Sequence, residues 1–338
     1  MAIDRPNPAM DEAEADRRLG ADRRDALAML AKADNRMLAG DHRAANAYYG
    51  QVGRLAAEGA PINRSELLRA RDACEWLARR FGDVIREGLV ERGLAVGDMH
   101  PRFAKSLALM LGERQREAVY VRYPQMPQMY FYPDLPHVEF ADPNSAEWAA
   151  MIEAQTDNIL SEAKALLAGG ADFGPYVKAT QDRPQGDVHG MLENSSWSTL
   201  DLTDKGAPVP ERIELAPKTW SSVSENAPLC DIGNRAPSVM FSMLRAGSRI
   251  PPHTGMINTR YVCHLPLIVP GNGALRVGEQ KREWEYGKLM MFDDTVEHEA
   301  WNDAATDRLV LIFDVWRPEI SAEERSQIRT LFEVVDAY

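Results

Sequence analysis

Two histidines stand out because each lies at the predicted end of a β-strand, where an imidazole ring can reach a metal ion. His253 follows two prolines, and His298 lies 45 residues later between two glutamates. Neutral imidazole is the commonest protein ligand for transition metals, and it suits zinc, copper, iron and nickel alike. The spacing therefore predicts a metal site with His253 and His298 as ligands, but it does not choose the metal.

A ferrous oxygenase site usually combines two histidines with one carboxylate and leaves three metal positions open. The carboxylate normally lies two residues after the first histidine, where this chain has Gly255. Two interpretations follow: the site does not hold iron, or it holds iron through two histidines with water in the third place. In the second interpretation Asp293 and Asp294 could hold that water or orient His298.

The segment around both histidines has the pattern of a small β-structure. Apolar, strand-like runs separated by Gly, Pro, Asn and Asp turn signals cover residues 238–244, 261–269, 275–277, 289–292 and 309–316. Short strands at this spacing predict a double-sheet barrel or jelly roll.

Alternation along two of these strands places chemically useful side chains on shared faces. Arg260, Val262 and His264 share one face, and Arg308 and Ile312 share another. If both faces point inward, His264 and Arg308 lie in one cavity. Alternatively, His264 is an ordinary core residue and Arg308 pairs with an acid at the surface.

The N-terminal part has helical patterning after a charged lead, residues 1–16, which we expect to be disordered because it holds few apolar residues. Apolar residues then recur every three or four positions over 22–59, and Gly40 divides them into a helix pair. This pair resembles a tetratricopeptide repeat, and a second pair is predicted over 65–94 with its division at Gly82. Because two units fall short of a solenoid, an ordinary helical bundle stays open as the alternative.

The expected order of domains makes the chain α+β. A helical, TPR-like domain over 17–122 is followed by a connector over 123–144, where four prolines lie among aromatic residues, and by the β-domain over 145–338. One amphipathic helix, 145–167, should cover the outer face of the barrel.

Composition excludes some classes of function and indicates where the protein works. The 338 residues carry a net charge of −12, which argues against a nucleic-acid backbone binder. The three cysteines are widely separated and form no metal-ligand spacing, so we expect reduced thiols. With neither a secretory signal nor an apolar run long enough to span a membrane, the expected location is the cytoplasm.

Several strings in this order resemble the aspartyl/asparaginyl β-hydroxylase family over residues 174–320. They are Phe241-Ser242-Met243-Leu244, Pro252-His253-Thr254-Gly255-Met256-Ile257-Asn258, His264-Leu265, Trp284-Glu285-Tyr286-Gly287-Lys288, Phe292-Asp293-Asp294, Glu297-His298-Glu299-Ala300-Trp301-Asn302 and Asp314-Val315-Trp316-Arg317-Pro318. The resemblance implies a double-stranded β-helix fold and an enzyme that uses Fe(II), O₂ and 2-oxoglutarate to hydroxylate the β-carbon of Asp or Asn. It also gives Gly255 a meaning, since glycine replaces the triad carboxylate in this family.

Carried over by position, the resemblance assigns His253 and His298 as catalytic iron ligands. It assigns Ser242, His264 and Arg308 to the binding of 2-oxoglutarate, whose distal carboxylate needs a cation and hydrogen-bond donors. Val262 departs from the family, which often has a second arginine there, and that departure bears on cosubstrate affinity.

Three readings of the function stay open. The first is hydroxylation of a peptide or protein substrate, with the helical half presenting that substrate. The second keeps the chemistry but acts on a free amino acid, a small peptide or a lipid acyl chain. The third is a catalytically silent barrel whose helical half binds partner proteins.

Overall fold

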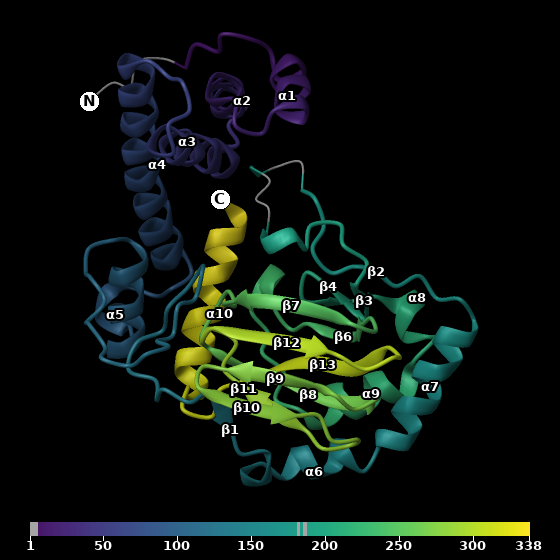
Figure 1. Ribbon diagram of the computed structural model, residues 1–338. Helices are drawn as coiled ribbons and strands as arrows, with labels where there is room; N and C mark the ends of the chain where they lie inside the picture. The colour runs from purple at the N-terminus through teal and green to yellow at the C-terminus, as the bar shows by residue number, and fades with distance from the viewer. Residues whose placement is uncertain (1–5, 181–182, 185–187) are drawn as a thin grey trace. The chain divides into compact units, whose positions relative to one another are not determined.

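The computed structural model describes residues 6–180, 183–184 and 188–338 (Figure 1). The chain forms two compact units. The first consists of Met1–Gly93, Ala179–Asp187 and Ala337–Tyr338, and the second of Leu94–Lys178 and Val188–Asp336. The first is helical and the second is built on a β-sandwich, so the chain is α+β as predicted.

The helices described in the first unit are α1 (Glu12–Ala21), α2 (Ala26–Leu38), α3 (His42–Ala57) and α4 (Arg64–Glu91). Each starts after an Asp or Asn whose side chain accepts a hydrogen bond from the backbone N–H three residues later. Such caps satisfy a donor that the helix itself leaves unpaired. The apolar faces pack into one cluster that includes Leu30, Tyr49, Val52 and Leu77.

The structure differs from the sequence prediction at two places in this unit. Residues 12–16, expected within the disordered lead, begin helix α1, and residues 1–5 lie outside the described residues. The predicted division at Gly82 is wrong, because α4 continues through it. A mid-helix glycine costs roughly 1 kcal/mol relative to alanine, and the Arg86 side chain occupies the space beside Gly82, 3.1 Å from where a Cβ would lie.

Two antiparallel sheets form the sandwich of the second unit (Figure 1). The larger sheet has the order β1-β11-β8-β13-β6-β3-β2, and the smaller has β10-β9-β12-β7. Their bounds are β1 (Phe140–Ala141), β2 (Gly174–Pro175), β3 (Trp197–Asp201), β6 (Val239–Leu244), β7 (Ser248–His253), β8 (Arg260–Ile268), β9 (Gly273–Val277), β10 (Gln280–Glu283), β11 (Met290–Phe292), β12 (His298–Asn302) and β13 (Arg308–Trp316). From β6 onward the chain alternates between the sheets, except at the β9–β10 hairpin, so neighbouring strands come from distant parts of the sequence.

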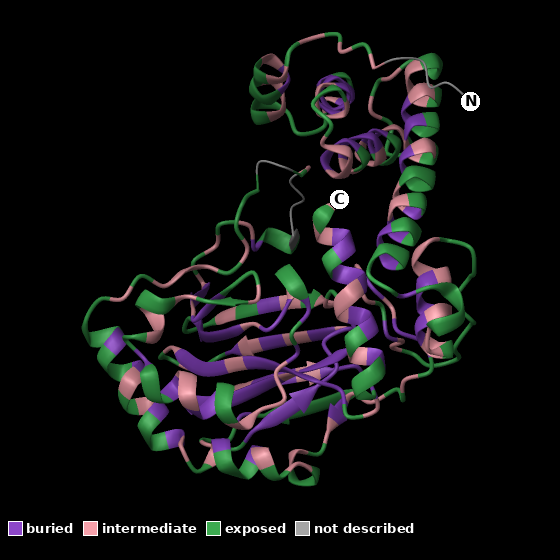
Figure 2. Cartoon of the chain, turned by 180° about the vertical axis from the view of Figure 1, so that it is seen from behind, coloured by how far each residue is buried: buried purple, intermediate pink, exposed green. Residues whose placement is uncertain are grey.

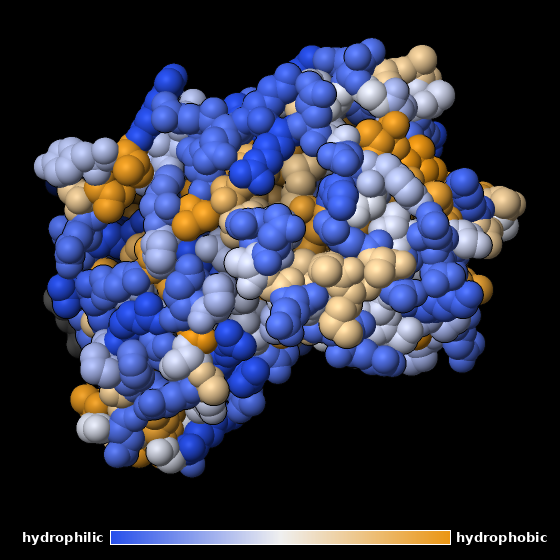
Figure 3. Space-filling model, turned by 90° about the horizontal axis from the view of Figure 1, so that it is seen from below, coloured by the Kyte–Doolittle hydropathy of each residue, from blue (hydrophilic) through white to orange (hydrophobic). Residues whose placement is uncertain are grey.

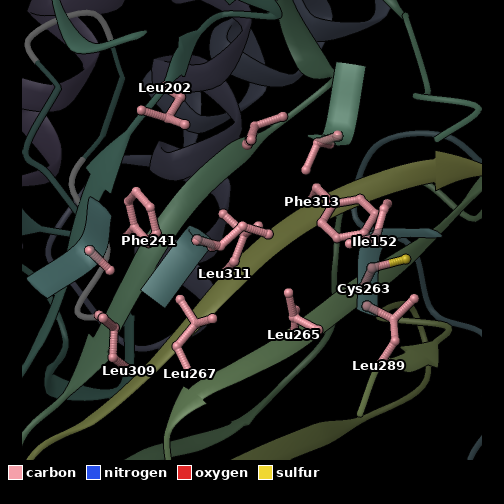
Figure 4. Close-up of a cluster of buried hydrophobic side chains, with 14 of the residues drawn as sticks. Ile152, Leu202, Phe241, Cys263, Leu265, Leu267, Leu289, Leu309, Leu311 and Phe313 are labelled. Atoms are coloured by element: carbon pink, nitrogen blue, oxygen red, sulfur yellow. The ribbon is translucent and has the colours of Figure 1, made fainter. Parts of the chain in front are cut away.

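Helices α6 (Glu147–Glu153), α7 (Thr156–Ala168) and α9 (Pro217–Asn226) contribute side chains to an apolar cluster with the larger sheet (Figure 4). The cluster takes alternate residues of β6, β8 and β13, including Phe241, Leu265 and Leu311. The single helix predicted over 145–167 is instead two helices. Thr156 Oγ1 donates to the Glu153 carbonyl at 2.6 Å, a local bond that accompanies the interruption.

The remaining helices of the second unit are α5 (Pro101–Met110), α8 (Pro210–Ile213) and α10 (Ala322–Ala337); β4 (Thr203–Asp204) and β5 (Ala207–Pro208) form a small hairpin. In Figure 2 most residues of the strands are buried, whereas the helices carry both buried and exposed residues. No helix in the described part of the chain combines the length and the apolar character that a membrane crossing requires. The face seen in Figure 3 is mostly hydrophilic, with hydrophobic side chains in small separate groups.

Candidate functional site

The two predicted metal ligands lie side by side on neighbouring strands. His253 ends β7 and His298 begins β12, and the two residues are partners in the antiparallel register. Their ring centroids are 4.1 Å apart. The 44 residues between them thus return the chain to the same point, as a shared metal site requires.

Backbone carbonyls hold both rings in a form suited to metal binding. The Nδ1 atom of His253 is 2.8 Å from the Pro251 oxygen, and that of His298 is 3.1 Å from the Val296 oxygen. An Nδ1–H that donates to a carbonyl leaves Nε2 with a free lone pair. Burial lowers the pKa of His253, and burial together with the neighbouring His253 lowers the pKa of His298 to about 3, so both rings are neutral at pH 7.

The sandwich encloses a cavity of about 500 Å³ between its sheets, and both histidines line it. Ser242, His264 and Arg308, the residues matched to cosubstrate binding, line the same cavity. They come from the central strands β6, β8 and β13 of the larger sheet. All five residues singled out from the sequence therefore meet in one space.

Arg308 is a buried cation without an acid partner. Its side chain is 2% exposed, its Nε and Nη2 atoms have no hydrogen-bond partner among the described residues, and its guanidinium carbon lies 4.6 Å from the centre of the Trp284 ring. Burial lowers the pKa of Arg308 to about 9, so the group stays charged at pH 7. Because an uncompensated buried charge is costly, this arrangement is that of an anion site.

Two polar side chains accompany Arg308 on the same face. Ser242 Oγ accepts a hydrogen bond from Trp197 Nε1 at 3.1 Å and keeps its own hydroxyl proton to donate. His264 packs edge-on against Phe292, and its Nδ1 atom has no partner in the part of the chain described. Burial and the nearby Arg308 hold the pKa of His264 well below its usual value, so the ring is neutral.

Gly255 has no room for a side chain. A Cβ placed on it would lie 2.0 Å from Asp294 Oδ2, so the Asp294 carboxylate takes the space that a ligand side chain at 255 would need. Burial raises the pKa of Asp294 to about 6. The sequence pointed to Asp294 as an orienting group, and the structure brings it to the cavity beside the histidines.

Sequence reasoning missed the partners of Arg260. This guanidinium donates to Asp294 Oδ2 at 3.2 Å and also to Asp314 Oδ2. Asp314 is 1% exposed and also accepts a hydrogen bond from the Ser238 backbone N–H at 2.8 Å. The signal was present in the sequence, because an acid inside the apolar run 309–316 needs a buried partner.

The connector also reaches the site, which the sequence pattern did not reveal. Backbone N–H groups of Met126 and Gln128 donate to the carbonyls of Thr295 and Gly255, at 2.7 and 3.0 Å. Gln125 is 6% exposed and donates to Asp293 through its side-chain amide. The connector thus ties together the two loops that carry His253 and His298.

The residues present fit a ferrous ion and 2-oxoglutarate. Within the described ranges no group of three or more His, Cys, Asp or Glu side chains could hold a metal ion, so two imidazoles are the candidate donors from the protein. The partnerless atoms of Arg308 and His264 match the need of a carboxylate for hydrogen-bond donors, provided that His264 carries its proton on Nδ1.

Residues 153–318 match the model of a family described as aspartyl/asparaginyl beta-hydroxylase. The aspartyl/asparaginyl beta-hydroxylase of Mus musculus is 35% identical over 139 residues, 41% of this chain and 18% of that protein. The ornithine lipid ester-linked acyl 2-hydroxylase of Rhizobium tropici is 32% identical over 174 residues, 51% of this chain and 58% of that protein. The aspartate beta-hydroxylase domain-containing protein 2 of Xenopus tropicalis is 28% identical over 213 residues, 62% of this chain and 55% of that protein. The chain therefore spans less than two thirds of each of these relatives.

Among solved structures, the Cupin_2 domain of an XRE family transcriptional regulator from Enterobacter cloacae aligns with a TM-score of 0.25 and 8% identity, covering 36% of this chain and 98% of that chain. Overlap this small carries no argument, and the fold description stands on the strand order. The family match contains strands β2–β13 and, with them, both histidines and the three polar residues beside them. Residues 153–318, which hold all five residues singled out from the sequence, are thus a match to the aspartyl/asparaginyl β-hydroxylase family.

Proposed function

We propose that this chain is a ferrous iron- and 2-oxoglutarate-dependent dioxygenase that hydroxylates the β-carbon of an Asp or Asn residue in a peptide or protein. The sandwich is, in this proposal, a double-stranded β-helix. The observation that carries it is the combination in one cavity of two neutral, adjacent imidazoles and a partnerless buried arginine. The family match supports the same chemistry.

His253 and His298 would hold the metal ion through Nε2, leaving the other coordination positions for cosubstrate, oxygen and water. When bound, ferrous iron supplies the activation of O₂ that is coupled to the oxidation of 2-oxoglutarate. One oxygen atom enters the C–H bond of the substrate and the other enters succinate as CO₂ is released. The carbonyls of Pro251 and Val296 would fix the imidazole orientation, and Asp294 lines the same cavity, where it would orient groups beside the metal.

Arg308 would bind the distal carboxylate of 2-oxoglutarate, with Ser242 and His264 donating beside it. A guanidinium in a desolvated site binds a carboxylate with strong, charge-assisted hydrogen bonds. The outer face of the same sheet excludes water, because helices α6, α7 and α9 cover it with apolar side chains.

A catalytically silent barrel is the weaker proposal. A barrel without a ligand gains nothing from an unpaired guanidinium that is 2% exposed, since an apolar residue of similar volume would be more stable there. In the dioxygenase proposal, the role of the helical unit is to present a protein substrate.

The cytoplasm remains the proposed location, because Cys74, Cys230 and Cys263 are free thiols.

Hydroxylation of a lipid acyl chain is a second candidate. It is favoured by the Rhizobium tropici relative, whose name describes an acyl 2-hydroxylase and whose match covers 58% of that protein. The chemistry at the metal would be the same, and only the occupant of the outer cavity would differ.

The test is succinate release from the full chain with ferrous iron, oxygen and 2-oxoglutarate, without a substrate. Dioxygenases of this chemistry turn over slowly when uncoupled, so we expect succinate that depends on both iron and oxygen. Absence of any succinate, with iron and 2-oxoglutarate shown to bind, would remove the proposed activity.

A further inference from the structure

Two arginines in the described part of the chain line the cavity, and they differ in whether an acid neutralises their charge. Arg308 has no acid partner, whereas Arg260 is bound by both Asp294 and Asp314. The described residues that line the cavity include no lysine. Burial lowers the pKa of His253, His264 and His298, which also line it, so these three rings add no positive charge at pH 7.

The cluster of Arg260, Asp294 and Asp314 holds one cation and two carboxylates. All three groups are buried, with exposures of 9%, 7% and 1%. Acids that are buried beside a guanidinium hold it tightly, because separating them would leave a charge without solvent. Arg260 is therefore not available to a carboxylate from outside.

Of the two arginines in the described lining, Arg308 is the one left to bind the proposed cosubstrate. Once its distal carboxylate lies on Arg308 and its keto acid lies on the ferrous ion, the charges of metal, cosubstrate and cavity side chains add up to neutral. A substrate aspartate would add a buried negative charge, and the described lining offers it no unpaired cation, so its desolvation would oppose binding. A neutral side chain avoids that cost.

The same cluster retains hydrogen-bonding capacity that suits an amide. Asp294 Oδ1 and Arg260 Nε have no partner among the described residues, so the cluster keeps one acceptor and one donor. A carboxamide carries both a donor and an acceptor, whereas a carboxylate carries acceptors only. The rest of the lining is apolar or neutral, with Tyr176, Trp197 and Met256 among its members.

We infer that the substrate residue is asparagine rather than aspartate, and that Arg260 with its two acids sets this preference. The inference rests on the proposed function and narrows its substrate class. Val262 supports it, because this apolar residue lies on the cavity side of β8 between Arg260 and His264 and adds no cation. Arg260 and Asp314 are positioning and specificity residues here.

The experiment compares two synthetic peptide libraries that are randomised on both sides of a fixed central Asn or a fixed central Asp. Each is incubated with the full chain, ferrous iron, 2-oxoglutarate and oxygen, and mass spectrometry measures one added oxygen. We expect the Asn library to be modified at least about tenfold faster, which corresponds to about 1.4 kcal/mol. Equal rates, or a preference for Asp, overturn the inference.

Two variants test the charge argument from opposite directions. Asp314→Asn removes one acid and leaves Arg260 with a single carboxylate, and Val262→Arg adds a cation to the cavity wall. Each should shift the ratio of Asp to Asn modification toward Asp by about tenfold or more. The matched control is Glu283→Gln, a carboxylate-to-amide change on the exposed strand β10, which should leave the ratio unchanged.

The variants' folding is checked by circular dichroism and by uncoupled succinate release, and either variant alone suffices for the test. If both fold and neither shifts the ratio, Arg260 does not set the preference. If the wild type releases succinate but modifies neither library, the peptide substrate is wrong while the oxygenase chemistry stands; acyl hydroxylation in a lipid extract would then identify the occupant. If no succinate forms at all, the proposed function itself fails.

Discussion

The two faces of the larger sheet come from the same strands, yet one face is apolar and the other carries buried polar side chains. On the outer face Phe241, Leu265 and Leu309 lie in a continuous apolar cluster beneath the helices (Figure 4). On the inner face their immediate neighbours in sequence are Ser242, His264 and Arg308, all buried. A single residue step along each strand thus separates a dry core from a polar cavity.

The comparison shows where stability is given up for a ligand. The outer face needs no ligand, because its apolar side chains have no hydrogen-bonding groups to pair and are stabilised by contact with one another. The inner face keeps atoms of His264 and Arg308 without partners among the described residues, which costs free energy unless a bound molecule completes them. Substitutions on the two faces should therefore affect different measurements.

The largest effect is expected on the inner side, at the metal. His298→Ala removes one of two imidazole ligands and should reduce 2-oxoglutarate turnover to background, measured as succinate with ferrous iron present. The matched control is His137→Ala: this exposed ring lies 2.8 Å from the Tyr123 carbonyl and should leave turnover unchanged. Turnover that survives in His298→Ala would remove this residue from the site.

Arg308→Met comes next and separates binding from stability. Loss of a charge-assisted pair should raise the KM for 2-oxoglutarate by about a hundredfold. The free energy of unfolding should stay the same or rise, because a buried cation without a partner is replaced by an apolar chain. Arg249→Met, at an exposed arginine paired with Asp303, is the control; a KM unchanged in Arg308→Met would contradict its role.

Leu311→Ala tests the outer face. Removing this fully buried side chain should lower the free energy of unfolding by about 3 kcal/mol, as large-to-small changes in a core do. Because Leu311 points away from the cavity, the KM for 2-oxoglutarate should change by less than about twofold. Chemical denaturation and steady-state kinetics on the same sample measure both, and a large KM change would show that the two faces are not independent.

The smallest effect is expected at the connector. Gln125→Ala removes the amide that binds Asp293 and should weaken ferrous iron binding by about tenfold, since outer hydrogen bonds orient metal ligands. The exposed Gln115→Ala is its matched control. Anaerobic iron titration gives the affinity, and an unchanged value would limit Gln125 to a structural role.

Local patterning predicted much of the site. Strand alternation put His264 and Arg308 each on a shared strand face, and the structure shows that both faces line the cavity. The polar neighbours of His253 and His298 indicated that these residues lie at strand ends. The order of helices before strands followed from the spacing of apolar residues, which changes along the chain from a helical period to the short apolar runs typical of strands. These features depend on residues close together in sequence.

The contacts that required three-dimensional information were those between distant segments. Asp314 inside an apolar run indicated a buried partner, but the local sequence did not identify Arg260 as that partner, and no pattern places Gln125 beside Asp293. The helix expected over 145–167 is interrupted where Thr156 bonds to the Glu153 carbonyl, and α4 continues through Gly82, so local breaker signals did not predict either helix boundary. The domain boundaries and the tetratricopeptide-like character of the helices stay predictions.

The central claim is that two imidazoles alone, from β7 and β12, hold one metal ion. Anaerobic titration of the full chain with ferrous iron, compared with His253→Ala, tests it most directly. We predict one ion per chain in the wild type and a loss of binding of at least a hundredfold in the variant. Undiminished binding of one ion in His253→Ala would contradict the account.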